Sequence, residues 1–265
     1  MKLDEELDER IRKSSRLILD AAVVVAFTGA GISTESGLKD FRGEGGLWKT
    51  YDPYYYANYR GFLERPELYW TMVKEERYGR DKEVKPNPAH LALAELEVMN
   101  RLDCIITQNV DGLHQIAGNK KVIEIHGSSR TSHCMKCKRE FSYGEIAAKL
   151  ELDEITPTCN DCRGVLKSDT VLFGEPLPVE PFNEALWWAE SADLMLVIGS
   201  SLTVFPAADL SKRVIQRGKK AILINLTETP FDADFDLIFY EKAGKILPFF
   251  VKEVRKEIGH TKEQL

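Results

Sequence analysis

The sequence predicts an α/β fold with a mostly parallel sheet, on three observations. Short β-branched apolar runs alternate with amphipathic segments, which is typical of βαβ units. The runs are apolar at nearly every position, so we expect helices to cover both faces of the sheet. Small or polar residues directly follow most of the runs, and ligands bind at this edge of open parallel sheets.

The individual elements follow from these patterns. Strands are expected at residues 22–27, 102–107, 122–125, 170–173, 194–198 and 221–224. Helices are expected at residues 4–19, 88–99, 181–190, 206–217 and 245–257. Pro88, Pro181 and Pro206 stand where a proline suits the first turn of a helix. The result is a Rossmann-like sheet with helices on both faces.

Two stretches do not follow this alternation. Residues 38–85 are rich in aromatic side chains and carry several short helical patterns, and residues 130–165 hold four cysteines among many polar residues. We expect both to form a smaller domain, a helical insertion with a four-cysteine zinc ribbon, comprising residues 38–85 and 130–165. The larger, discontinuous Rossmann-like domain would comprise residues 1–37, 86–129 and 166–260.

Length, charge and hydropathy exclude several classes of protein. A chain of 265 residues, 43% hydrophobic and 29% charged, can bury a full core. Its formal net charge of -6 disfavours affinity that comes from neutralising phosphates, so no direct sequence-specific nucleic-acid binding is expected. The charged N-terminus does not resemble a signal peptide, and no run approaches the roughly 18 apolar residues of a membrane span. We therefore expect a cytoplasmic protein that does not bind membranes.

Four of the five cysteines form two CxxC pairs, Cys134 with Cys137 and Cys159 with Cys162. The thiolates of two such pairs can close a tetrahedron around zinc. Four thiolates leave no open coordination position for a substrate, so the metal is expected to be structural. A redox pair or inert thiols are the alternatives. Cys104 lies in an apolar run and is expected to be a small core residue.

The residues that follow five expected strands are predicted to form one site. TGAGIS, QNVDG, HG, GSS and Asn225 follow these strands, and the carboxyl ends of parallel strands meet at one edge. Gly29, Ala30 and Gly31 would let the backbone approach a pyrophosphate near a helix N-terminus, with an ordinary turn as the alternative. The usual dinucleotide fingerprint is incomplete, because the next glycine is Gly37. Asn225 is the better candidate for binding a ribose hydroxyl.

His126 is the expected general base, because histidine titrates near neutral pH. Among the five histidines, only His126 directly follows an apolar strand, and Gly127 after it leaves room for a ligand. His90 lies in the expected helix 88–99, His114 lies in a further segment with helical character and His260 lies in the tail, so these three are expected to be structural or solvated. A capping or core histidine is the alternative for His126.

Together these segments resemble the sirtuin family, of the archaeal or bacterial type. The segments that carry the resemblance occur in the family's order and spacing: GAGISTESGLKDFRG (29–43), TQNVDGLH (107–114), HG (126–127), the two CxxC pairs, LFGE (172–175), GSSLTVFPA (199–207) and LIN (223–225). The resemblance spans nearly the whole chain. It implies a NAD-dependent protein-lysine deacetylase, or deacylase, that uses NAD as co-substrate, holds one structural zinc and releases nicotinamide, O-acyl-ADP-ribose and free lysine.

The resemblance also implies roles for the residues at matching positions. It makes His126 the catalytic base and gives Asn109 the role of ordering the reacting ribose. The cofactor-binding residues that it implies are Gly29, Ala30, Gly31, Thr34, Phe41, Arg42, Gln108, Val110, Asp111, Gly199, Ser200, Ser201, Asn225, Lys242 and Ala243. The substrate-binding residues that it implies are Val171, Phe173, Gly174 and Val204, on two edges between which an acyl-lysine peptide adds as a strand. The metal ligands that it implies are Cys134, Cys137, Cys159 and Cys162.

In the reaction that the resemblance implies, the acyl oxygen attacks the anomeric carbon of the nicotinamide ribose and nicotinamide leaves. His126 then takes a proton from a ribose hydroxyl, so that this oxygen can attack the acyl carbon. The expected partners are acyl-lysine proteins or peptides, with a chromatin protein among the candidates. Mono-ADP-ribosyl transfer from the same NAD site and a non-enzymatic nucleotide-sensing zinc-ribbon module are the alternatives.

Two residues depart from the family pattern, because Lys39 and Ser168 stand where sirtuins usually have proline. Losing a fixed φ is expected to loosen both backbone segments without removing a reacting group. The region 66–85 lacks the Tyr-x-x-Arg pair with which one sirtuin class binds negatively charged acyl groups. We therefore expect neutral acyl groups such as acetyl.

Overall fold

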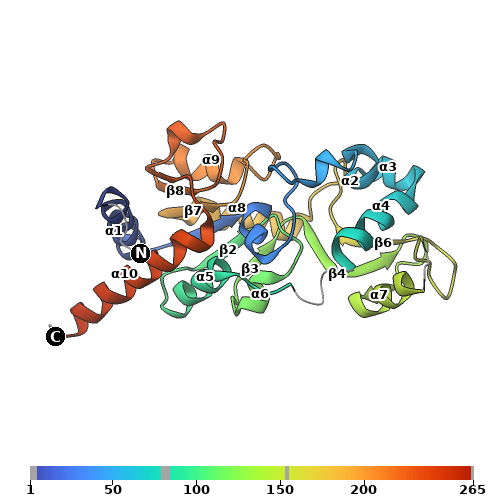
Figure 1. The fold of residues 1–265 in the computed structure, drawn as a ribbon, viewed down its shortest axis with the longest axis horizontal. Coiled ribbons are helices and arrows are strands. Elements are labelled where there is room, and N and C mark those ends of the chain that lie inside the picture. Colours follow the sequence, from blue (N-terminus) through green and yellow to red (C-terminus); the bar gives the residue numbers. More distant parts are fainter. Residues whose placement is uncertain (1–4, 79–83, 153–154, 264–265) are drawn as a thin grey trace.

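The computed structural model describes residues 5–78, 84–152 and 155–263, and its centre is a six-stranded parallel sheet (Figure 1). The strands are β1 (Val24–Thr28), β2 (Cys104–Thr107), β3 (Val122–Glu124), β7 (Leu194–Ile198), β8 (Lys220–Ile224) and β9 (Leu237–Phe239). Their spatial order is β3-β2-β1-β7-β8-β9, with every neighbouring pair parallel. Numbered in chain order this is 3-2-1-4-5-6, the doubly wound order of dinucleotide-binding folds. The expected fold class is therefore confirmed.

Helices cover both faces of this sheet, as the apolar strands predicted. They are α1 (Glu5–Asp20), α5 (Pro88–Val98), α6 (Leu113–Ala117), α8 (Val179–Ser191), α9 (Asp209–Gln216) and α10 (Ala243–Glu263). One buried cluster joins α1, α5 and α10 to one face of the strands, and a second joins α8 and α9 to the other face. Alternate residues of β1 divide between the clusters, Val24 and Ala26 in the first and Val25 and Phe27 in the second.

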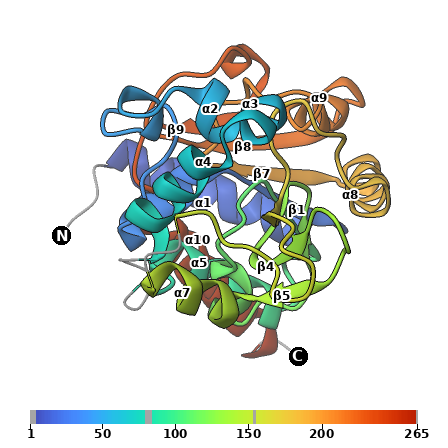
Figure 2. The same cartoon turned by 90° about the vertical axis from the view of Figure 1, so that its right-hand side faces the viewer.

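A smaller module lies beside the sheet (Figure 1), faces the viewer in Figure 2, and draws on both insertions. Its helices are α2 (Pro53–Ala57), α3 (Tyr59–Glu64), α4 (Pro66–Val73) and α7 (Tyr143–Glu151). Its strands are β4 (Gly127–Cys134), β5 (Glu140–Ser142) and β6 (Leu166–Thr170), which form an antiparallel sheet of order β5-β4-β6. Trp70 of α4, Phe141 of β5 and Cys159 share one buried cluster. The domain boundaries stated above stay a prediction.

Local sequence accounts for where several helices begin. The Asn87 side chain accepts a hydrogen bond from the Ala89 N–H, and Pro88 occupies the first turn of α5. Ser142 and Glu145 form a capping box at the start of α7. Neither α7 nor the short strand β9 was predicted from the sequence. The short turns η1 (Ala30–Ser36), η2 (Leu47–Lys49), η3 (Lys74–Tyr78) and η4 (Asp232–Asp234) complete the described elements.

Three sequence predictions about these elements are wrong. The strand expected at 170–173 is β6, which ends at Thr170 and pairs antiparallel in the small sheet, because the residues after it form a turn. The helix expected at 206–217 begins at Asp209, so Pro206 lies in the turn before it. The last helix, expected at residues 245–257, is longer and extends from Ala243 to Glu263.

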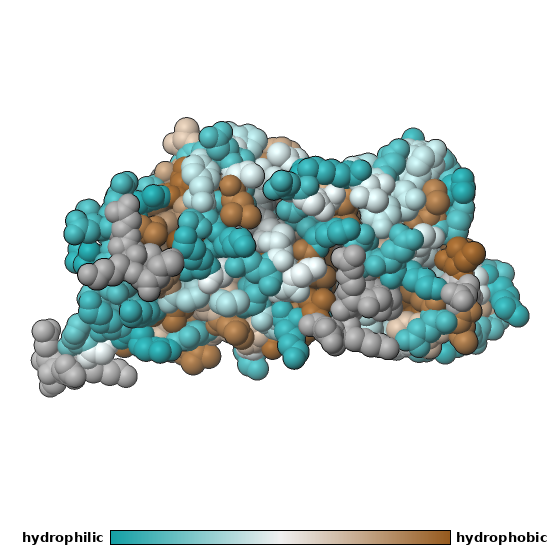
Figure 3. Space-filling view, in the orientation of Figure 1, coloured by the Kyte–Doolittle hydropathy of each residue, from teal (hydrophilic) through white to brown (hydrophobic). Residues whose placement is uncertain are grey.

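The surface in the view of Figure 3 is mostly hydrophilic, and its apolar atoms form small separate patches. Among the residues that the structure describes, no helix combines the length and the apolar composition that crossing a bilayer requires.

Candidate functional site

A large cavity of about 1160 Å³ lies at the carboxyl edge of the parallel sheet. Its walls come from the loops that follow β1, β2, β7 and β8 and from α4 of the small module. Every catalytic, cofactor-binding and substrate-binding residue predicted from the sequence lines this one cavity. The loops after β1 and β7 meet at the point where the strand order reverses, which is where ligands bind in doubly wound sheets.

Three glycines let the loops after β1 and β7 touch backbone to backbone. The Gly31 N–H donates to the Gly199 carbonyl at 2.8 Å, and the Gly29 N–H donates to the Ile198 carbonyl at 3.0 Å. A Cβ on Gly29 would lie 2.7 Å from the Gly199 oxygen, and one on Gly31 would lie 2.7 Å from the Gly199 Cα. Gly199 itself has φ +61°, and a Cβ there would lie 2.2 Å from the Ile32 nitrogen. This contact requires glycine at all three positions.

A chain of hydrogen bonds orders the polar side of the cavity. The Asn109 Nδ2 donates to the Gly29 carbonyl at 3.1 Å and to the Ser33 Oγ at 3.2 Å. The Ser33 Oγ donates in turn to an Asp111 carboxylate oxygen at 2.8 Å, and the other oxygen accepts the Leu113 N–H at the start of α6. Ser33 was not predicted, although it lies within the GAGIS segment. Its role as a link between two loops depends on tertiary contacts.

The His126 ring is fixed by the residue that precedes Asn109. Its Nδ1 lies 3.1 Å from the Gln108 carbonyl oxygen, which can only accept, so Nδ1 carries the proton and Nε2 is the basic nitrogen. Burial lowers the pKa of His126 below its ordinary value, and the hydrogen bond to Gln108 partly opposes this. The ring is therefore neutral at pH 7 and able to accept a proton.

Gln108 also connects the loops after β2 and β7. Its side-chain Nε2 donates to the Ser200 Oγ at 2.9 Å. Because its backbone carbonyl accepts from His126, this one residue joins the imidazole to the loop that contains Ser200 and Ser201. The predicted convergence of strand ends is thus carried by specific hydrogen bonds.

Three of the predicted substrate-binding residues, Val171, Phe173 and Gly174, lie on the side of the cavity that faces the small module, and the fourth, Val204, lies in the loop after β7. The Val171 N–H donates to the His126 carbonyl at 2.8 Å. Phe173 forms an isolated bridge with Asn58, in which its N–H donates to the Ala57 carbonyl at 2.7 Å and its carbonyl accepts from the Tyr59 N–H at 2.9 Å. Residues 171–174 therefore join the base to the helical insertion.

Aromatic and aliphatic side chains of the helical insertion complete the cavity wall. The Phe41 and Trp48 rings lie 4.9 Å apart between centroids, and Trp48 lies 6.5 Å from Phe173. Further wall residues that sequence reasoning did not single out are Leu47, Tyr56, Tyr69, Met72 and Val73. In the sequence, the one feature that pointed to these residues was the aromatic-rich character of residues 38–85. That feature does not predict which face of each short helix lines the cavity.

The four cysteines of the CxxC pairs gather at one point of the small module. Their Sγ atoms all lie within 4.8 Å of one another, with Cys134 and Cys162 at 3.5 Å and Cys137 and Cys159 at 3.7 Å. Four thiolates at the usual Zn–S bond length in a tetrahedron lie about 3.8 Å apart. The arrangement therefore fits one zinc ion. None of these cysteines is among the described residues that line the cavity, so the metal has a structural position.

His90 and His114 are buried in helices next to the site, as expected for structural residues. The two rings lie 4.9 Å apart, and the His114 Nε2 hydrogen-bonds the Thr28 Oγ1 at 2.9 Å. Cys104 is a buried residue of β2 in the sheet core, also as expected.

Comparison with known proteins places the chain in a family. The sequence pattern of the Sir2 family matches residues 29–206. A NAD-dependent protein deacetylase of Sulfolobus acidocaldarius is 44% identical over 249 residues, which cover 94% of this chain and 97% of that protein. A NAD-dependent protein deacylase 2 of Archaeoglobus fulgidus is 42% identical over 252 residues, covering 94% and 98%.

Solved structures agree with these relatives. A structure described under "Structural Basis for the Mechanism and Regulation of Sir2 Enzymes" superposes with a TM-score of 0.89 at 41% identity, covering 94% of this chain and 99% of that one. A Sir2 complex with a p53 peptide and NAD+ superposes with a TM-score of 0.81 at 37% identity, covering 98% and 99%. By its sequence pattern, its relatives and its fold, this chain belongs to the Sir2 family.

Proposed function

We propose that the cavity carries out NAD-dependent deacetylation of lysine side chains in peptides or proteins and releases nicotinamide, O-acyl-ADP-ribose and free lysine. The curated relatives of this chain are named NAD-dependent protein deacetylases and deacylases. A neighbouring Sir2 structure holds a deacetylated p53 peptide together with 3'-O-acetyl ADP-ribose. The chain is accordingly an enzyme that transfers an acyl group to ADP-ribose, with NAD as co-substrate.

The observation that carries this proposal is the position of His126. Its ring lines the cavity, its Nδ1 is held by the Gln108 carbonyl, and its pKa is lowered by burial. A neutral imidazole with a fixed tautomer is suited to take a proton from a sugar hydroxyl. Asn109 orders the site beside it through the Gly29 carbonyl and Ser33.

The cavity has the size and the chemistry to hold NAD. Its volume of about 1160 Å³ exceeds the usual range of ~300–1,000 Å³ for small-molecule pockets, which leaves room for an acyl-lysine beside a dinucleotide. In our assignment, Gly29, Ala30, Gly31, Thr34, Phe41, Arg42, Gln108, Val110, Asp111, Gly199, Ser200, Ser201, Asn225, Lys242 and Ala243 bind NAD. Bound NAD supplies the anomeric carbon that accepts the acyl oxygen. Phe41, packed on Trp48, is placed to exclude water from that carbon.

We assign the peptide to the side of the cavity formed by Val171, Phe173, Gly174 and Val204, which all line it. A strand added there gains backbone hydrogen bonds with modest demands on sequence. A neutral acyl group such as acetyl is the proposed substrate group, because the sequence of residues 66–85 has no Tyr-x-x-Arg pair for a negatively charged acyl group.

The remaining proposals concern partners and location. A chromatin protein is among the candidate acyl-lysine substrates, and no direct sequence-specific nucleic-acid binding is expected from the net charge of -6. We retain a cytoplasmic location as a proposal, supported by two CxxC pairs arranged as metal ligands.

The test is the release of nicotinamide from NAD in the presence and absence of an acetylated peptide, with mass spectrometry of the products. We expect peptide-dependent nicotinamide release with O-acetyl-ADP-ribose as product, and a loss of about 10²–10⁴-fold in His126→Ala. His260→Ala, the same substitution at an exposed histidine, is the matched control. If His126→Ala is as active as the parent, the base assignment is wrong. An ADP-ribosylated protein in place of acetyl-ADP-ribose would instead indicate mono-ADP-ribosyl transfer.

A further inference from the structure

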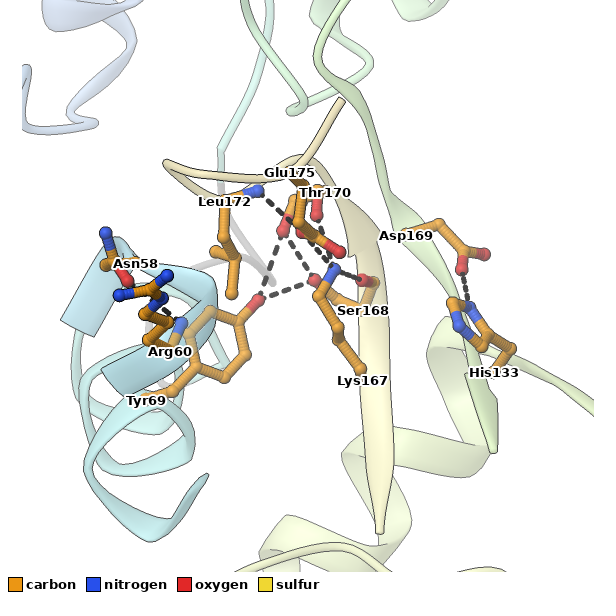
Figure 4. Close-up of polar contacts among 10 residues, drawn as sticks. All are labelled: Asn58, Arg60, Tyr69, His133, Lys167, Ser168, Asp169, Thr170, Leu172 and Glu175. Carbon is orange, nitrogen blue, oxygen red and sulfur yellow. Dashed lines mark hydrogen bonds and ion pairs between the residues drawn. The ribbon is translucent and has the colours of Figure 1, made fainter. Parts of the chain in front are cut away.

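A buried lysine lies directly beneath the proposed peptide-binding edge. Lys167, in β6, is only 3% exposed. Its Nζ donates to the backbone carbonyls of Ser168 at 3.1 Å and Thr170 at 2.8 Å, and it pairs with the Glu175 carboxylate at 2.9 Å (Figure 4). An ammonium group has three N–H donors, and these contacts use all of them. A buried charge persists only when it is paired and hydrogen-bonded, so Lys167 requires this arrangement.

Glu175, the carboxylate partner of Lys167, also closes the turn that follows β6. The Glu175 N–H donates to the Leu172 carbonyl at 3.0 Å, and its carboxylate accepts the Leu172 N–H at 2.8 Å. Gly174 has φ +88°, which the third residue of a type II turn requires. The Lys167 ammonium therefore joins the end of β6, through the Thr170 carbonyl, to Glu175 at the end of this turn, and residues 171–174 lie between these two anchors.

A cation is needed here because three oxygen acceptors converge. Without the ammonium, two backbone carbonyls and one carboxylate would face one another with little access to water. The Glu175 side chain is 20% exposed, so water can reach it only in part. Losing the positive charge of Lys167 would therefore open the turn and displace residues 171–174.

Hydroxyl groups hold the end of β6, from which residues 171–174 continue. The Ser168 Oγ lies 2.5 Å from the Tyr69 Oη and 2.8 Å from the Thr170 Oγ1 (Figure 4). Tyr69 comes from α4 and also lines the cavity. Ser168 occupies the position where sirtuins usually have proline, so this link between β6 and α4 uses a hydroxyl that proline lacks. With the segment held on both sides, its shape depends on the Lys167 charge at one side and on α4 at the other.

We propose that Lys167, together with Glu175, is a positioning residue that sets the affinity for the acyl-lysine peptide. It contacts no reacting atom; it acts by holding residues 171–174, and the first of these, Val171, donates to the His126 carbonyl. This inference rests on the proposed function, because it takes residues 171–174 as the peptide-binding edge. The hydrogen bonds and the ion pair of the Lys167 ammonium given above all go to residues 168–175. None of them goes to a loop that surrounds the predicted NAD site.

The experiment compares Lys167→Met and Lys167→Arg with the parent enzyme in steady-state kinetics, with peptide and NAD varied separately. We expect Lys167→Met to raise KM for the acetylated peptide by about tenfold or more while KM for NAD changes less than about twofold. Lys167→Arg keeps the charge but must fit a larger head group into a buried site, so its peptide KM is expected to lie between those of the parent and of Lys167→Met. Lys220→Met, which removes an exposed lysine paired with Asp236, is the matched control and is expected to have no effect.

Further variants keep the outcome decisive. If Lys167→Met melts like the parent and its KM for the peptide is unchanged, the inference is overturned. Equal rises in KM for the peptide and KM for NAD also overturn it. If Lys167→Met does not fold, Glu175→Gln takes its place: a rise in peptide KM of about threefold or more supports the inference, and no rise overturns it. Gly174→Val places a β-branched residue at positive φ and distorts the edge directly. If its peptide KM is also unchanged, the peptide-binding edge itself is wrongly assigned.

Discussion

The Val171 N–H donates a hydrogen bond to the His126 carbonyl oxygen at 2.8 Å. One peptide group therefore joins the proposed base to the proposed peptide-binding edge. The His126 ring is held separately, through Nδ1 and the Gln108 carbonyl. The backbone and the ring of His126 therefore have different partners. A displacement of the peptide-binding edge acts directly on the His126 backbone, and it acts on the ring only through that backbone.

The pH dependence of the reaction should report the neutral state of His126. Burial lowers its pKa below 6.5, and only the neutral ring accepts a proton, so activity should fall on the acid side with a midpoint below pH 6.5. We expect kcat/KM measured between about pH 5 and pH 8 to show this limb. The residual activity of His126→Ala should lack it. A midpoint above pH 6.5 in the parent would contradict this assignment of the base.

Removing the metal should destabilise the small module before it affects chemistry. Cys134 and Cys159 belong to the same buried cluster as Tyr69 and Trp70, and Tyr69 also lines the cavity. We expect Cys159→Ala, or a strong chelator, to lower the unfolding temperature by roughly 10 °C and to reduce activity in parallel. Metal analysis and calorimetry measure both, with Cys104→Ala as a control that keeps its zinc. Activity lost at an unchanged unfolding temperature would argue against a structural metal.

Lys39 should strengthen NAD binding rather than loosen the cofactor loop. Its Nζ lies 2.8 Å from a Glu76 carboxylate oxygen that also accepts from the Tyr51 hydroxyl. The pair is only partly exposed, and both residues line the cavity. We expect Lys39→Ala to remove this link to the cofactor loop, to raise KM for NAD about threefold and to make KM for NAD less dependent on salt. Lys220→Ala, which removes an exposed lysine paired with Asp236 away from the cavity lining, is the control. An unchanged KM for NAD would contradict this prediction. The expected loosening of the backbone, caused by the missing proline, would then be the main consequence of Lys39.

Acid should destabilise the fold through His90 and His114. Burial lowers the pKa of His90 to about 4 and holds that of His114 well below its ordinary value, with Asp111 partly opposing the shift at His90. The unfolded chain takes up these protons below pH 6.5 and the folded chain does not. Stability is therefore fully present above pH 6.5 and is lost as pH falls toward 4, by up to about 1.4 kcal/mol per pH unit for each histidine.

Denaturant unfolding at a series of pH values measures this slope. Below pH 6.5, His114→Gln should reduce the dependence of the unfolding free energy on pH by the contribution of one histidine. This holds whatever the substitution does to stability at neutral pH. The control is His260→Gln, because that side chain is exposed. An unchanged slope in His114→Gln would show that other groups take up the protons.

The parallel sheet and the convergence of its loops could be predicted from the sequence, because their causes are local. The apolar strand runs determine burial on both faces, and parallel strands bring their carboxyl ends to one edge. His126 and Asn225 were found in this way, and the structure places both in the cavity. The catalytic and binding roles given to these residues stay predictions.

What the sequence did not predict depends on contacts between distant segments. Residues 170–173 are apolar like a strand, but Glu175 and Gly174 close a turn there. A lysine usually lies on the surface, so the sequence does not predict that Lys167 is buried. The three oxygen atoms that converge on its ammonium group explain the burial. The partnership of Ser33 with Asp111 likewise joins loops that are far apart in the chain.

The contact of Gly29 and Gly31 with Gly199 limits how this enzyme can change. No side chain takes part, so no single substitution there can tune affinity for the co-substrate without separating the two loops. Adjustment has to come from other residues that line the cavity, such as Ser201 and Asn225, which have side chains. An engineer who wishes to alter cofactor preference should diversify those residues and leave the three glycines unchanged.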